Sequence, residues 1–159
     1  MSRNSAIAAD TKVETPEGAM TIRAAAGQAI AVLTKATDDK RLFRLMNDVQ
    51  KIADGQPVLR ITLENGLSFR VGPDQILFAH GMVERRAGDL TAGTALESAF
   101  HFPAGHRYKD AQGNERVSTG AWQVTGVEPA GSADTYRLRV HQTGTFFVSA
   151  GVLCKADEN

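Results

Sequence analysis

Apolar and polar residues alternate over residues 58–63 and again over 67–71, and this period of two predicts a pair of half-buried β-strands. Asn65 and Gly66 lie between them and predict a two-residue turn with positive φ at both positions. Pro73 then ends the second strand, because proline has no amide hydrogen for the ladder and a fixed φ. The centre of the chain is therefore predicted to be an antiparallel β-hairpin.

Short apolar stretches separated by turn residues continue on both sides of this hairpin. They predict strands at residues 12–15, 20–22, 30–33, 76–78, 122–127 and 136–140, with a turn at 129–132. Residues 97–120 predict a loop-rich excursion with an exposed hairpin tip at 110–114. Residues 146–154 are almost continuously apolar, as expected for one strand buried on both faces. Such spacing is typical of a sandwich or a closed β architecture.

Residues 38–54 fit two different elements. Leu42, Leu45, Met46 and Val49 fall at helical spacing, and Gly55 follows at the position of a helix C-cap. The competing prediction is a long edge strand that bends at residues 47–48. The residues alone leave both predictions open.

Composition and charge exclude several classes of partner. The chain of 159 residues has the length of one domain, and its 18 Lys and Arg residues balance 18 Asp and Glu residues. The chain therefore lacks the basic patch that would predict nucleic-acid binding. It also lacks a run of the ~18 apolar residues that a membrane helix needs. The N-terminus has no apolar segment of a signal peptide. Cys154 is the single cysteine, which excludes an internal disulfide and favours a cytoplasmic location; the chain is also expected to be a monomer.

Candidate chemistry outside these patterns is sparse. His80, His101, His106 and His141 are the only histidines, and their spacing matches no established metal site, so no metal and no cofactor is predicted. Ligand binding through His80, His101 or His106 stays open as an alternative function. Asp74 has two interpretations as well: an acid or base beside a histidine, or a residue that caps its own turn.

Four blocks in a fixed order carry a family resemblance. Residues 6–11 (AIAADT) resemble an opening Cys-Leu-Ala-Gly-Asp-Thr motif, and residues 12–18 the strand and Pro-x-Gly turn that follow it. Further matches are the hairpin with residues 72–75, then residues 82–93, and last residues 135–140 and 147–156. This order resembles the Hint domains, the self-processing fold of inteins, bacterial intein-like domains and the Hedgehog C-terminal domain.

The resemblance covers residues 6–156, interrupted by an insertion at 97–120 and flanked by 1–5 and 157–159. It implies an all-β fold, a pseudo-symmetric horseshoe or disc with long β-hairpins, and so favours a strand over a helix at 38–54. It also implies a chemistry in two parts. A Cys at the first position attacks the carbonyl of the preceding residue, here Ser5, and makes a thioester. A terminal Asn then cyclises and cleaves the chain before Asp157, so the partners are the flanking segments, or exteins.

This sequence departs from the family pattern at the reactive positions. Ala6 and Ala156 replace the Cys and the Asn, so neither reacting group is present. Gly72, Gln75 and Lys155 replace the Thr and the two His residues, and an amide cannot act as an acid near neutral pH. We therefore expect no processing of the chain as written. Arg137 stands where an Asp is common, and the possible supporting groups are Asp74, His141 and Cys154, the last equally well explained as a buried small residue.

Two explanations of this inactivity are open. Ala6 and Ala156 are the substitutions that would be chosen to trap an uncleaved precursor, and we favour this interpretation for those two positions. Gly72, Gln75 and Lys155 serve no such purpose and are taken as natural. The alternative is a naturally degenerate, catalytically dead Hint-fold domain that binds a partner. In either case the Ser5–Ala6 bond should lie beside Lys155 and Ala156 and face residues 72–75, because the family chemistry needs both ends at one site.

Overall fold

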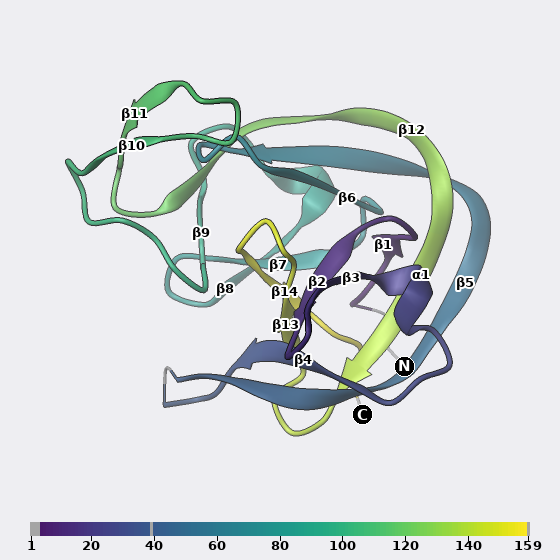
Figure 1. Cartoon of the computed structure of the whole chain (residues 1–159). Coiled ribbons are helices and arrows are strands. Elements are labelled where there is room, and N and C mark those ends of the chain that lie inside the picture. The colour runs from purple at the N-terminus through teal and green to yellow at the C-terminus, as the bar shows by residue number, and fades with distance from the viewer. Residues whose placement is uncertain (1–3, 39, 159) are drawn as a thin grey trace.

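The computed structural model describes residues 4–38 and 40–158 of the chain. Two long strands, β5 (Arg41–Leu63) and β12 (Trp122–Val140), run antiparallel and curve together around the molecule (Figure 1). The shorter elements are β1 (Ile7–Ala8), β2 (Lys12–Thr15), β3 (Gly18–Thr21), α1 (Ile22–Ala25), β4 (Ile30–Lys35), β6 (Ser68–Val71), β7 (Ile76–Ala79), β8 (Val83–Arg86), the 3-10 helix η1 (Ala87–Asp89), β9 (Ala95–Leu96), β10 (Arg107–Lys109), β11 (Glu115–Val117), β13 (Thr145–Phe147) and β14 (Leu153–Lys155). The all-β prediction is confirmed.

Most of these strands join one sheet of ten, in the order β13-β14-β7-β9-β12-β1-β6-β5-β4, with β8 beside β7. Residues 38–54, which fitted both a helix and an edge strand, mostly belong to β5. Within the described part of this stretch Arg41–Met46 pair with β4, and the residues from Met46 to Ala53 pair with β12, so that only Met46 has a ladder partner on both sides. The predicted strand is therefore confirmed there, and β5 has strands on both sides only further on, where Leu59–Thr62 pair with β6 as well as with β12. The expected bend is present at Asp48, whose φ is 57°. No helix in the described residues is long and apolar enough to cross a membrane.

The predicted turn at 129–132 does not form, and β12 continues through it. Pro129 pairs with Leu59 and Ser132 with Pro57, with a register shift between the two pairs. Because β5 offers a pairing partner on both sides of the irregularity, the strand curves at this point instead of reversing.

The hairpin of β5 and β6 has the predicted pairing, from Leu59 opposite Val71 to Thr62 opposite Ser68. Its turn differs from the prediction, since Gly66 is the only residue of the turn with positive φ, at 82°. The Gly66 N–H donates to the Leu63 carbonyl over 2.9 Å, and the Leu63 N–H donates to the Leu67 carbonyl over 2.9 Å. The loop therefore has three residues, and the side chain of its middle residue, Asn65, accepts the Leu67 N–H.

Two apolar stretches differ from their predicted elements. Residues 146–154 form the hairpin of β13 and β14 instead of one strand, with Phe146 opposite Cys154. Most of the hairpin is buried, so its turn at 148–152 carries apolar residues that a periodicity argument reads as strand. The predicted strand at 20–22 ends one residue early, because Thr21 caps α1 by accepting the Ala24 N–H.

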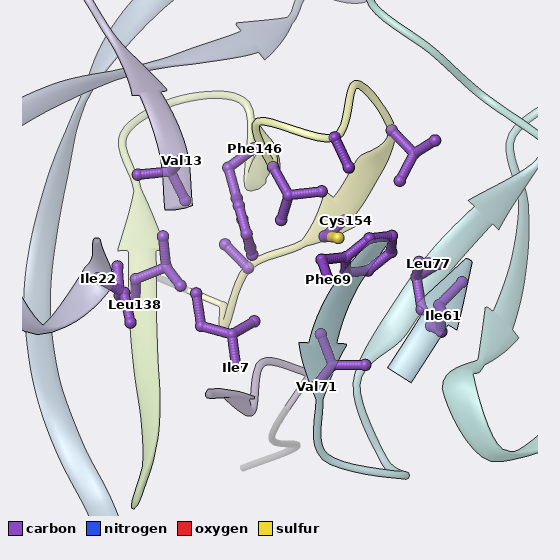
Figure 2. Packing of buried hydrophobic residues seen from close by; sticks show 14 of the residues in the cluster. Ile7, Val13, Ile22, Ile61, Phe69, Val71, Leu77, Leu138, Phe146 and Cys154 are labelled. Atoms are coloured by element: carbon purple, nitrogen blue, oxygen red, sulfur yellow. The ribbon is translucent and has the colours of Figure 1, made fainter. Parts of the chain in front are cut away.

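The core fills the space inside the curve of the two long strands (Figure 2). Ile7, Phe146 and Leu138 are fully buried there, and each such side chain stabilises the fold by about 1.5–3 kcal/mol. Ile7 pairs with Tyr136 of β12 on one side and with Val71 of β6 on the other. The short β1 is thus clamped in the middle of the sheet, and it fixes the residues just before it.

The insertion at 97–120 contains the hairpin of β10 and β11, as the sequence predicts, with its tip at 110–114. This tip folds back over the β5–β6 turn. The Ala111 N–H donates to the Asn65 carbonyl, and the Gln112 side chain donates to the Gly66 carbonyl, each over 2.8 Å. The insertion therefore packs on the opposite end of the sheet from the chain termini (Figure 1).

Candidate functional site

The N-terminal junction, defined here as the Ser5–Ala6 bond, lies just before β1. Two backbone hydrogen bonds from the segment after β6 hold it. The Gly72 N–H donates to the Ala6 carbonyl over 2.7 Å, and the Ile76 N–H donates to the Asn4 carbonyl over 3.0 Å. Residues 72–76 therefore face the junction, which is the placement that the sequence analysis expects.

Gln75 joins the N-terminal junction to the strand at the other end of the chain. Its side chain is fully buried, and its Oε1 accepts the Ala6 N–H over 2.8 Å. Its Nε2 donates to the Lys155 carbonyl over 3.0 Å and to the Ile76 carbonyl over 2.8 Å. One amide group thus contacts the nitrogen of the Ser5–Ala6 bond and the peptide that precedes Ala156. Because these partners use both ends of the amide, it has no proton to give to the Ala6 nitrogen.

The C-terminal junction, defined as the Ala156–Asp157 bond, is buried beside the N-terminal one. Asp157 Oδ1 accepts three hydrogen bonds: from the Asn4 N–H at 2.8 Å, and from the Ser5 N–H and Ser5 Oγ at 2.9 Å each. Asn4 Nδ2 donates to the Ala156 carbonyl over 3.4 Å. The residues before the first junction and after the second are therefore bound directly to each other.

Arg137 connects this cluster to the long strands. Its Nη1 lies 4.0 Å from Asp157 Oδ2, and its Nη2 pairs with Asp48 Oδ2 at 2.5 Å. Arg139 also pairs with Asp48. An arginine at position 137, in place of the acid common in the family, therefore meets two carboxylates of this chain. The direct contact of Asp157 with Ser5 was not predicted, and no local pattern indicates it, since 152 residues separate the two.

A cavity of about 600 Å³ opens beside the N-terminal junction. The Arg86–Asp74 ion pair stands at its wall, with both side chains largely exposed. Asp74 therefore pairs with an arginine and not with a histidine. The cavity is lined by residues on both sides of the junction and by those that face it: Ser5, Ala6, Ile52, Ala53, Gln56, Pro57, Gly72, Pro73, Asp74, Ile76, Arg86 and Thr135.

Three other candidate side chains lie away from the junctions. Lys155 Nζ pairs with Glu84 Oε2 of β8 at 3.0 Å, so only the backbone of this residue takes part in the cluster. Cys154 is fully buried in the core, and burial raises the pKa of its thiol. His141 is exposed in the turn after β12. None of the three supplies an acid, base or nucleophile to either junction.

The remaining histidines have separate surroundings. His101 Nδ1 lies 3.2 Å from Ser98 Oγ, and the His106 ring stacks on Phe102 with centroids 4.6 Å apart. His80 is exposed in the turn after β7. Within residues 4–38 and 40–158, no group of three or more His, Cys, Asp or Glu side chains could hold a metal ion. The histidine-based ligand site therefore has no convergent geometry in this part of the chain.

Solved structures with the same architecture are inteins and intein-like domains. A DnaB intein from Synechocystis has a TM-score of 0.72 at 11% identity, covering 96% of this chain and 99% of that chain. A DnaX mini-intein from Spirulina platensis has 0.70 at 13%, and a bacterial intein-like domain from Clostridium thermocellum has 0.71 at 16%, each with the same coverage. No sequence-family model and no curated protein matches the chain.

At these identities the likeness establishes the fold. The chain has the Hint fold of inteins and bacterial intein-like domains, over nearly its whole length.

Proposed function

We propose that this chain is a self-processing Hint domain whose two junctions are assembled but whose reacting side chains are missing at Ala6 and Ala156. The observation that supports this most strongly is the Gln75 side chain, which contacts the Ala6 nitrogen and the Lys155 carbonyl at once. Bringing two bonds from opposite ends of the chain to one buried group is what a two-step reaction in cis requires.

The first step needs a thiol at position 6. Its sulfur attacks the Ser5 carbonyl carbon, the bond to the residue 6 nitrogen breaks, and a thioester and a free amine result. The leaving nitrogen needs a proton, which Gln75 cannot supply although its Oε1 contacts that nitrogen, because a neutral amide does not act as an acid near neutral pH. Water from the adjoining cavity takes this role, and the missing general acid costs about 10²–10⁴-fold in rate.

The second step needs an asparagine at position 156. Its side-chain nitrogen attacks its own backbone carbonyl, which breaks the bond to Asp157 and leaves a cyclic imide. The Asn4 Nδ2 hydrogen bond to the Ala156 carbonyl stabilises the charge that develops on this oxygen. Asp157 carries a carboxylate where ligation needs a hydroxyl or a thiol, so cleavage dominates over splicing of the flanks.

The test places a different folded reporter at each end of the chain and compares Ala6→Cys, Ala156→Asn, the double variant and the parent. Ala6→Cys should release the N-terminal reporter after Ser5 on addition of dithiothreitol. Ala156→Asn should slowly release a C-terminal reporter that begins at Asp157. The parent should keep both junctions intact.

Intact-mass measurement identifies the bond that is cut in each case. A double variant that is folded, as its circular dichroism would show, yet stays whole with and without thiol would overturn the proposal. That outcome would favour the alternative, in which the chain is a catalytically dead Hint-fold domain that binds a partner.

A further inference from the structure

We infer that Ser5 and Asp157 form a second acyl-transfer centre, which acts on the Asn4–Ser5 bond and needs neither residue 6 nor residue 156. The reaction is a shift of the Asn4 acyl group from the Ser5 nitrogen to the Ser5 hydroxyl oxygen. The inference stands on the contacts of these residues and is independent of the chemistry proposed above.

The nucleophile and the base are in direct contact. Ser5 Oγ lies 2.9 Å from Asp157 Oδ1, with Ser5 fully buried and Asp157 only 3% exposed. The Leu138 N–H donates to Ser5 Oγ over 3.2 Å, so Oγ accepts this hydrogen bond and donates its own proton to another group. The Leu138 carbonyl at 3.4 Å is the more distant acceptor, and a carboxylate accepts more strongly than a carbonyl. The hydroxyl proton therefore points to Asp157.

The bond to be broken is polarised at its carbonyl. The Asn4 oxygen accepts the Ile76 N–H over 3.0 Å. A fixed backbone donor at this oxygen stabilises the negative charge that develops when the carbonyl carbon is attacked. This donor belongs to Ile76, and the buried Gln75 side chain holds Ile76 in place by donating to its carbonyl.

A single oxygen can carry the proton through the step. Asp157 Oδ1 accepts the Ser5 Oγ proton as the oxygen bonds to the Asn4 carbonyl carbon. It lies 2.9 Å from the Ser5 nitrogen as well, and it returns the proton there as the Asn4–Ser5 bond breaks. The products are an Asn4–Ser5 ester and a free amine on Ser5, and no co-reactant is consumed. Arg137 lies against the other carboxylate oxygen, Oδ2, so it does not compete with Ser5 for Oδ1.

The amide is the more stable of the two forms, so the ester is expected as a minor species that an added nucleophile traps. The test incubates the purified chain with hydroxylamine at neutral pH and follows its intact mass. The expected product has lost the residues before Ser5, which leave as a hydroxamate. Cleavage at the Asn65–Gly66 bond, a known target of this reagent, gives fragments of a different mass.

Three variants separate chemistry from structure. Ser5→Ala should abolish the release. Ser5→Cys should increase it and make it respond to dithiothreitol, because a thioester forms in place of the ester. Asp157→Asn keeps an oxygen that accepts the same hydrogen bonds but cannot take the proton, so it should slow release by ~10²-fold or more, in the parent and in the Ser5→Cys background.

Release from the parent or the Ser5→Cys variant that Asp157→Asn slows supports the centre. No release from either folded protein, or release that Asp157→Asn leaves unchanged, would overturn it and assign the Asp157 contacts to structure alone. Because the cut lies before Ser5, these results are distinguishable from success or failure of the Ala6→Cys experiment, whose cut lies after Ser5.

Discussion

Gly72 lies directly against Ala6. Its N–H donates to the Ala6 carbonyl over 2.7 Å, and a Cβ atom on Gly72 would lie 3.1 Å from the Ala6 Cβ and 3.3 Å from the Ala6 oxygen. Contacts this short are tighter than ordinary van der Waals contact, so a side chain at position 72, where the family pattern has a threonine, would require Ala6 to move by a few tenths of an ångström. The glycine therefore sets the distance between β6 and the N-terminal junction.

We predict that Gly72→Ala destabilises the protein by about 1–3 kcal/mol, since the new methyl group forces the Ala6 backbone to move. Urea unfolding measures the change in the free energy of unfolding. Gly126→Ala is the matched control, because a Cβ on Gly126 would meet nothing within 4 Å. Equal effects of the two substitutions would show that the close approach to Ala6 carries no steric cost.

Gln75→His should accelerate thiol-dependent cleavage in the Ala6→Cys background. An imidazole titrates near neutral pH and can protonate the leaving nitrogen, and the gain expected from a general acid is about 10²–10⁴-fold. The rate of reporter release measures it. Gln75→Met, of similar length but without polar atoms, serves as the control and should give no acceleration. A histidine variant as slow as the methionine variant would contradict the role assigned to this position.

Phe146→Ala should lower the free energy of unfolding by about 3–5 kcal/mol, because the ring is fully buried in the main core cluster, opposite Cys154 of β14, and its loss leaves a cavity. Phe100 offers a matched control, since it is 61% exposed. Its alanine variant should stay within about 0.5 kcal/mol of the parent. Chemical denaturation measures the free energy of unfolding of both variants. Similar decreases for the two would show that Phe146 contributes no more to the core than an exposed residue does.

Tyr108 makes stability depend on alkaline pH. Burial, and then the neighbouring Glu64 carboxylate, raise the pKa of Tyr108 from 10.0 to about 12. Folding therefore favours the neutral phenol, and this contribution is complete below pH 10.0 and is lost as pH rises towards 12. The free energy of unfolding of the parent should fall relative to that of Tyr108→Phe over this interval.

The single tryptophan gives a second measurement of the same event, because the Tyr108 and Trp122 rings lie 5.7 Å apart. Loosening of β10 against the sheet should shift the Trp122 fluorescence of the parent above pH 10.0, with a smaller shift in the phenylalanine variant. Parallel curves for the two proteins would show that Tyr108 does not titrate in this way.

The amino-acid sequence by itself determined the fold class and the place of the junctions. Alternation over 58–63 and 67–71 predicts which faces are buried, and the paired strands are found there. The order of motifs places Ala6, Gln75 and Ala156 in one constellation before any coordinates are considered. The alternation is a property of neighbouring residues, which a period can express, whereas the meeting of Ala6, Gln75 and Ala156 is what the family resemblance implies.

Tertiary structure alone decided which strands pair and which distant side chains are in contact. Helical spacing over 38–54 yields to the pairing of β5, first with β4 and from Met46 onward with β12, because a paired neighbouring strand outweighs local propensity. The apolar run 146–154 folds back on itself as a hairpin. The sequence could not predict this, because a segment buried on both faces has no period that separates one strand from a hairpin. The contact of Ser5 with Asp157 spans 152 residues, and it forms because both ends of the chain pack on β12: Ile7 pairs with Tyr136, and the Asp157 N–H donates to the Leu138 carbonyl.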